Sequence, residues 1–131
     1  MTTTWAHLPN AALIDAVLAD VKARPEAWVA AEDAAADAAW DDTWDAARDA
    51  ARVAAWSDAK AATRRTAWVA ARAEAEDAGW DAIYALIAWD DCAHLLDLPS
   101  DTLRTMADLC DAPACHQAVL LLPYALVREA A

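Results

Sequence analysis

The stretch from Glu26 to Ala78 constrains the fold most strongly, because its 53 residues contain neither glycine nor proline and 23 of them are alanine. Alanine has the highest helix propensity, whereas glycine and proline have the lowest. Tryptophan recurs every twelve residues from Trp44 to Trp80. Since the whole chain of 131 residues contains one glycine and five prolines, the sequence predicts an all-α protein.

A helical wheel divides this stretch into two halves. From Asp33 to Arg52 the charged residues fall on one side of the wheel and the alanines on the other, but after Trp56 the two sides exchange. The charged side then holds Lys60, Arg64, Arg65 and Arg72, and the apolar side holds Ala62, Thr66, Val69, Ala70 and Ala73. One straight helix cannot bury both faces, so we expect a break between Ala54 and Asp58. A single long helix that presents different faces to different neighbours is the alternative.

Residues 1–9 are expected to form a loose N-terminal arm, and residues 10–131 a single helical domain. Trp5 and Leu8 are expected to touch the body. Asn10 suits the N-cap of a first helix over 11–23.

The second half of the chain is richer in large apolar residues. The pattern predicts one amphipathic helix over 80–97, a short helix capped by Ser100, and a last helix from about 111 to 129. The last helix is apolar nearly all round, so it should lie centrally. Together these elements predict a compact bundle of five to six helices that includes the long Ala/Trp-rich segment.

The sequence offers no catalytic constellation. Neither serine lies in a G-x-S-x-G turn, and one glycine cannot build a phosphate-binding loop. The possible metal ligands are Cys92, His94, Cys110, Cys115 and His116. Cys92 and His94 would diverge on a helix, so buried reduced thiols and half-exposed histidines are the better interpretation. We predict a protein that is not an enzyme and has no cofactor or metal.

The formal net charge of −12 argues against direct binding of nucleic acid, because the chain as a whole repels phosphate. Acids concentrate in residues 32–45 and 77–111, and bases in residues 48–72. The start, MTTTWAHLPN, lacks the features of a signal peptide, and no window is apolar enough to span a membrane. Three cysteines without a disulfide-framework spacing suit a reducing cytoplasm. We therefore expect a cytoplasmic protein.

Eight tryptophans are more than a core of this size easily hides, and tryptophan is enriched at binding hot spots. Trp40 and Trp44 share a helix face beside Asp37, Asp41 and Asp45. We predict that these five residues form a partner-facing patch, which could be a homo-oligomer interface. A base also follows three tryptophans by four residues, in the pairs Trp44–Arg48, Trp56–Lys60 and Trp68–Arg72, where its stem can lie over the indole.

The run AIYALIAWDDCAHLLDLPSDTLRTMADL, followed by AVLLLPYAL, carries a resemblance. Together with the Ala/Trp-rich segment before it, this run resembles small uncharacterised helical proteins of actinobacteria and their phages, mainly over residues 80–127. The resemblance implies a phage or prophage accessory protein that acts in the bacterial cytoplasm, and it transfers no catalytic residue.

These observations predict a protein–protein interaction module that binds and modulates a bacterial host protein. Two alternatives stay open. One is an acidic DNA mimic that inhibits a nucleic-acid-binding host enzyme, with the two acidic blocks lining one face. The other is an immunity or antitoxin-like binder.

Overall fold

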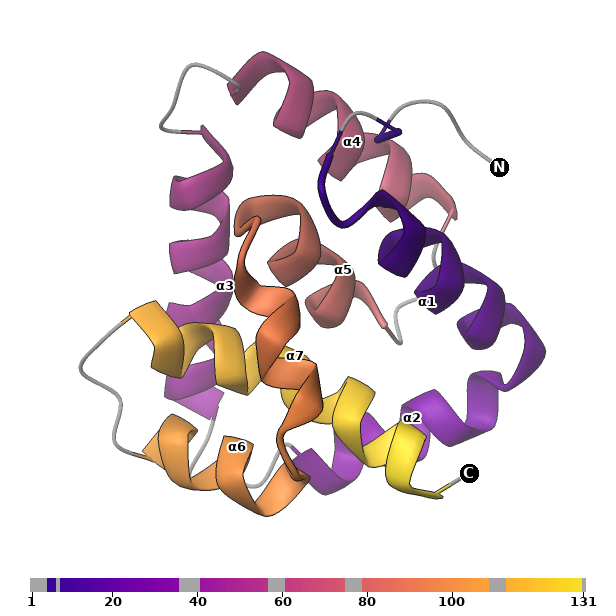
Figure 1. Cartoon of the computed structure of the whole chain (residues 1–131), viewed down its shortest axis with the longest axis vertical. Helices are drawn as coiled ribbons and strands as arrows, with labels where there is room; N and C mark the ends of the chain where they lie inside the picture. The colour runs from indigo at the N-terminus through magenta and orange to yellow at the C-terminus, as the bar shows by residue number, and fades with distance from the viewer. Residues whose placement is uncertain are drawn as a thin grey trace.

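The structure, a computed structural model, describes residues 5–6, 8–35, 41–56, 61–74, 79–108 and 113–130. All regular structure in these ranges is helical (Figure 1). The helices are α1 (Ala11–Ala23), α2 (Pro25–Ala35), α3 (Asp41–Trp56), α4 (Ala61–Glu74), α5 (Trp80–Ala88), the 3₁₀ helix η2 (Cys92–Asp97), α6 (Ser100–Asp108) and α7 (Pro113–Ala130). The all-α prediction is confirmed, but the predicted number of five to six helices is wrong. None of the helices in the described ranges is long and apolar enough to cross a membrane.

One additional helix arises where a single helix over 80–97 was predicted. α5 ends at Ala88, because Trp89 adopts an extended conformation with φ −127° and ψ 116°. The carbonyl groups at the end of α5 and at Trp89 bind side chains from distant parts of the chain: Asn10 Nδ2 donates to the Leu86 and Trp89 oxygens, at 3.0 Å each, and Arg64 donates to the Ile87 oxygen. Helix ends need such partners, and here distant side chains supply them.

Within its described residues, the stretch from Glu26 to Ala78 contains three helices. α3 ends at Trp56 and α4 begins at Ala61, which agrees with the break expected near Ala54–Asp58. A second break, between α2 and α3, was not predicted. Ala31 is buried on α2 and Ala47 on α3. Sixteen residues at about 100° each place two positions roughly 160° apart on one helix, so a straight helix would point its two buried faces in opposite directions.

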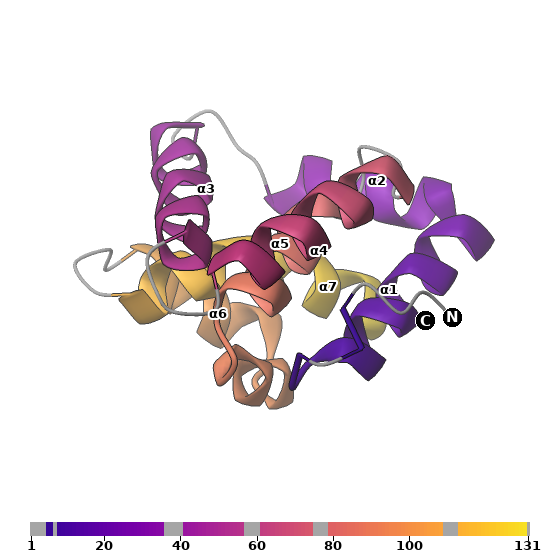
Figure 2. The same cartoon turned by 90° about the horizontal axis from the view of Figure 1, so that it is seen from above.

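α7 is the central helix, as predicted. It packs against α2, α3, α5, α6 and η2, and it crosses the middle of the molecule in both views (Figures 1 and 2). The run from Ala118 to Leu122 is buried along its whole length. A helix that is apolar all round is stable only when neighbours surround it, and this run accounts for the layout of the other helices.

The described part of the predicted N-terminal arm is anchored. Trp5 and Leu8 are buried, and Trp5 Nε1 donates to Asp15 Oδ1 at 2.9 Å. Asn10 precedes α1 as predicted, but its side-chain amide binds the end of α5 instead of capping α1. The start of α1 is therefore fixed by a contact with a helix more than seventy residues further along the chain.

Gly79 begins α5 with a φ of +93°, in the left-handed region that favours glycine. A Cβ atom at this position would lie 2.6 Å from Val21 Cγ2, on α1. Both the backbone conformation and the approach of α1 therefore require glycine at this position.

We predict that Gly79→Ala lowers the free energy of unfolding by about 1–3 kcal/mol, because the new methyl group meets Val21 and the backbone stays left-handed. Chemical denaturation measures the change. In a Val21→Ala background the loss should be smaller, since the collision is removed and only the backbone cost remains. An equal loss in both backgrounds would show that the close approach to Val21 does not matter.

Candidate functional site

A buried carboxylate fixes α3 against α5. Asp81, in the first turn of α5, is 2% exposed. Trp44 Nε1 donates to its Oδ2 at 2.6 Å, and Arg48 donates from Nε to Oδ1 at 2.8 Å and from Nη2 to Oδ2 at 3.1 Å. Arg48 also lies over the Trp44 ring at 5.5 Å, as its i, i+4 spacing predicted. A buried charge needs a partner and hydrogen bonds, and α3 supplies both.

A second carboxylate, from α2, adjoins this ion pair. Glu32 Oε1 accepts a hydrogen bond from the Gly79 backbone N–H at 2.9 Å. The pKa of Glu32 is raised from 4.5 to about 7, mainly because the carboxyl is buried. The Gly79 N–H and Arg48 act against this rise, and the charge of Asp81 adds to it. Glu32 is thus the acid of this cluster that changes its protonation near neutral pH.

α4 is fixed in a similar way by Arg64. Its side chain is buried, and it donates to the Ile87 backbone oxygen and, from Nη2 at 3.0 Å, to Asp90 Oδ2. The wheel had placed Arg64 on the polar side of α4 and Val69 on the apolar side. The structure reverses both positions, because Arg64 lies in phase with Ala67, Trp68 and Ala71, which are all buried.

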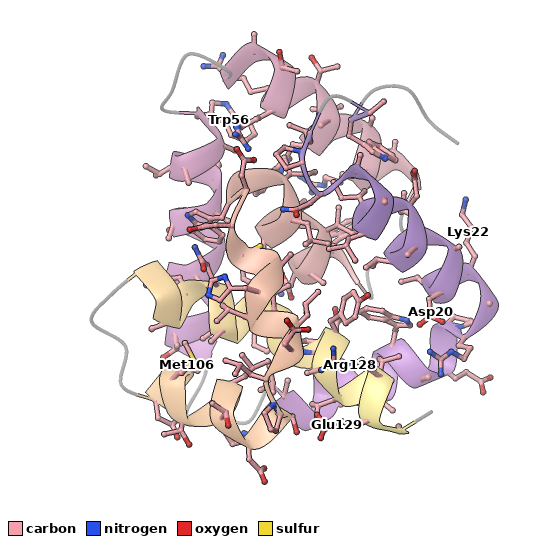
Figure 3. All side chains as sticks on the ribbon, viewed as in Figure 1. Asp20, Lys22, Trp56, Met106, Arg128 and Glu129 are labelled. Atoms are coloured by element: carbon pink, nitrogen blue, oxygen red, sulfur yellow. The ribbon has the colours of Figure 1, made fainter. Side chains whose placement is uncertain are left out.

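A row of aromatic side chains connects α3 and α4 to α5. Trp56 meets Trp68 edge to face with ring centroids 5.3 Å apart, and Trp68 stacks on Tyr84 at 3.9 Å with nearly parallel planes. Trp80 lies beside Tyr84 at 6.3 Å. Burial raises the pKa of Tyr84, so the phenol stays neutral. The row forms a floor that reaches the surface at Trp56, at the corner where α3 and α4 meet (Figure 3).

Arginines cover the ends of this row. Arg65 lies over the Trp56 ring at 5.7 Å and Arg72 over the Trp80 ring at 5.1 Å. The i, i+4 spacing in the sequence predicted other tryptophan–base pairs. Arg72 was expected over Trp68, which instead stacks on Tyr84 and meets Trp56 edge to face, and Lys60 lies outside the described residues.

The α3/α4 groove is the hollow that opens above the aromatic row. Its cavity volume is about 480 Å³, and it is lined by Arg52, Trp56, Trp68, Val69, Arg72 and Ala73. Val69 is 66% exposed, and Val53, which neighbours Arg52 on α3, is 61% exposed. The groove thus combines an aromatic floor, one exposed valine and two arginines, of which Arg52 forms an exposed ion pair with Asp49 at 3.3 Å. Among its lining residues there is no acid.

A second hollow, of about 280 Å³, lies between α1, α2 and α7. Its polar groups satisfy one another: Arg24 makes two hydrogen bonds with Asp20, and Trp28 Nε1 donates to the same carboxylate at 2.8 Å. Figure 3 shows Asp20 beside this site and Lys22 pointing away from the body. Arg128 also lines this hollow and donates to the Leu98 backbone oxygen. No large apolar side chain lining this hollow is as exposed as Val69 of the α3/α4 groove.

The predicted partner-facing patch needs one correction. Trp44 is 5% exposed, and its indole is used inside the protein to bind Asp81. Asp45 is exposed beside it. Trp40 and Asp37 lie outside the described residues, as does the side chain of Asp41. The patch as a whole stays a prediction, but Trp44 is not accessible to a partner.

The residues weighed as metal ligands do not gather among the described side chains: no group of three or more potential ligands is present there. Cys92 is buried, its Sγ donates to the Ala85 oxygen, and burial raises its pKa to about 12. His94 is exposed and binds the Asp91 backbone oxygen. Cys115 is disulfide-bonded. The expectation of reduced thiols is therefore wrong for Cys115.

No family model, no curated protein and no solved structure matches this chain. Its function has to be inferred from its own residues.

The Asp81 ion pair predicts that two neighbouring arginines contribute very differently to the free energy of unfolding. Arg48→Met removes the cation from a buried carboxylate, and we expect a loss of about 2–3 kcal/mol in unfolding free energy. This is less than for a fully buried pair, because half of the Arg48 side chain is in solvent. Arg52→Met, one turn further along α3, should change stability by about 0.5 kcal/mol or less. Equal effects in denaturant titrations would contradict the role of Asp81.

Glu32 predicts a pH dependence of stability. Between pH 4.5 and about 7 the unfolded chain loses the Glu32 proton while the folded chain keeps it, so the unfolding free energy falls as the pH rises through this window. Glu32→Gln keeps an acceptor for Gly79 and cannot ionise. It should be more stable than the wild type at pH 8 and nearly equal to it at pH 4. Glu26→Gln, at an exposed position of the same helix, is the control; a wild-type pH profile for Glu32→Gln would contradict the prediction.

Proposed function

We propose that this chain is a non-enzymatic protein-binding module that holds its partner in the α3/α4 groove. The observation that supports this proposal most is the combination of exposed apolar and basic side chains there. Val69 and Trp56 line the groove together with Arg52 and Arg72, and Val53 is exposed next to Arg52, in a chain whose net charge is −12. Tryptophan and arginine are the residue types that most often dominate binding energy at interfaces.

The charge of the groove defines the chemistry of the partner. The sequence of α4 from Ala62 to Ala73 contains three arginines and no acid. Arg64 is turned inward, whereas Arg65 and Arg72 are exposed. An acidic segment that presents one apolar side chain would match this surface, because complementary charge steers association and fixes register. Nucleic acid would meet the same arginines but would be repelled by the rest of the chain.

The biological setting follows from the resemblance to small actinobacterial and phage proteins. We propose a phage-type accessory protein that binds and modulates a host protein in the bacterial cytoplasm. An immunity or antitoxin-like protein would be a binder of the same kind, and genetic linkage to a toxin would identify it.

The DNA-mimic alternative requires the two acidic blocks to line one surface. Three of their carboxylates are used within the protein: Asp81 binds Trp44 and Arg48, Asp90 binds Arg64, and Glu32 accepts from Gly79. These carboxylates are not available to imitate phosphates at regular spacing. We therefore favour the groove.

The proposed function predicts binding of a labelled peptide that carries glutamate, leucine and aspartate at positions i, i+3 and i+7 of a helical sequence. Fluorescence anisotropy should show saturable binding. The double variant Arg52→Glu/Arg72→Glu should lose about tenfold or more in affinity, which corresponds to roughly 1.4 kcal/mol. Trp56→Ala should lose a comparable amount, because the aromatic floor is removed.

Two controls separate this site from general electrostatics. Lys22→Glu changes the charge of an exposed residue on α1 that does not line the groove and lies across the molecule from Trp56 (Figure 3), and it should leave the affinity unchanged. A peptide with lysine at both acidic positions should not bind. Equal binding of both peptides, or equal loss for Lys22→Glu and the groove variants, would contradict the proposal.

A further inference from the structure

Exposed large apolar side chains occur at two places in the described residues. Val53 and Val69 belong to the α3/α4 groove and its border, and the third such residue, Val29, lies on α2 with 51% of its surface exposed. Exposed valines are unremarkable singly. What distinguishes these three is the charge of their neighbours: Arg52 and Arg72 line the groove, with Asp49 paired to Arg52 beside it, whereas the neighbours on α2 are acids.

The surroundings of Val29 form a regular helix face. Glu26, Val29, Ala30 and Asp33 follow i, i+3, i+4 and i+7 spacing and are all exposed, while Trp28, Ala31 and Ala35 on the opposite side of α2 are buried. Glu26 and Asp33 are two helical turns apart, about 10 Å, with Val29 between them. We call this surface the α2 face. It has no basic residue.

We propose that the α2 face of a second copy of this chain docks into the α3/α4 groove. Val29 would contact the exposed part of Trp56 and Val69, and the two acids would lie near Arg52 and Arg72. The two surfaces are complementary in both charge and apolar character. This inference rests on the proposed function, because it names a partner that satisfies the same groove chemistry.

The geometry makes this contact head-to-tail. Figure 1 places α4 at one end of the long axis and α2 toward the other, so the groove and the α2 face of one molecule lie apart. An interface between two different surfaces leaves one of each free on every pair, and it therefore extends into rings or filaments instead of closing as a dimer.

The proposed self-association should be weak, because the interface is small and both copies are acidic. A stable interface buries about 800 Å² on each partner, and one helix face in a shallow groove buries less. The charge of −12 on each copy also opposes association at low ionic strength. At about 0.15 M salt the Debye length is about 8 Å, so the overall repulsion is screened while contacts within the groove persist. Self-association should therefore appear at high concentration in physiological salt.

Two single-surface variants test the inference. Val29→Glu blocks the α2 face and leaves the groove intact, whereas Arg52→Glu/Arg72→Glu blocks the groove and leaves the α2 face intact. All three positions are exposed, and circular dichroism checks that both variants fold. Sedimentation equilibrium in about 0.15 M salt should show that wild-type mass rises above 14.0 kDa with concentration. Each variant alone should stay monomeric, and an equimolar mixture should reach twice the monomer mass and stop there.

A wild-type mass that stays at 14.0 kDa at the highest concentration would overturn the inference. So would continued assembly of Val29→Glu, or a mixture of the two variants that stays monomeric. The acidic peptide distinguishes this failure from failure of the proposed function, because Val29→Glu keeps its groove. If Val29→Glu binds the peptide while the wild type does not assemble, only the self-docking inference fails. If Val29→Glu does not bind the peptide, the proposed function fails as well.

Discussion

The buried carboxylate of Asp81 holds α3 against α5, and the wall of the groove that α3 forms depends on this contact. Trp44 and Arg48 both reach Asp81, which leaves Val53, on the side of α3 opposite Trp44, in solvent and places Arg52 one turn beyond Arg48. Arg64 has the same effect on α4. Its guanidinium binds Ile87 and Asp90, and Val69 is left exposed. Two buried charges thus determine which side of each helix faces a partner.

Alanine makes this arrangement possible. The buried faces of α3 and α4 are mostly alanine, at Ala47, Ala51 and Ala55 on α3 and Ala67 and Ala71 on α4. Small residues contribute less hydrophobic burial than leucine or isoleucine, so α3 and α4 are weakly specified by apolar pattern alone. Buried hydrogen-bonded charges then select one orientation from several that are similar in apolar content.

The weak apolar pattern of α3 and α4 also explains which features of the fold could be predicted from the sequence. The helical class, the break near Trp56 and the central position of α7 follow from propensity and from strong apolar patterns. The orientation of α4 does not, because a wheel that sorts residues by polarity places Arg64 outside and Val69 inside. A lone acid at Asp81 in the apolar run from Trp80 to Ala88 was the available signal for the buried pair. The contacts of Asn10 and Glu32 with α5 join residues too distant in sequence for any local pattern to reveal them.

The central claim is that the α3/α4 groove is the binding surface of this protein. The most direct test is an NMR titration of the tryptophan indole N–H groups with the acidic peptide, using Trp28, which lines the second hollow, as the internal reference. We predict that the Trp56 and Trp68 signals shift in a saturable way while the Trp28 signal stays in place. Shifts at Trp28 with none at Trp56 would contradict the claim.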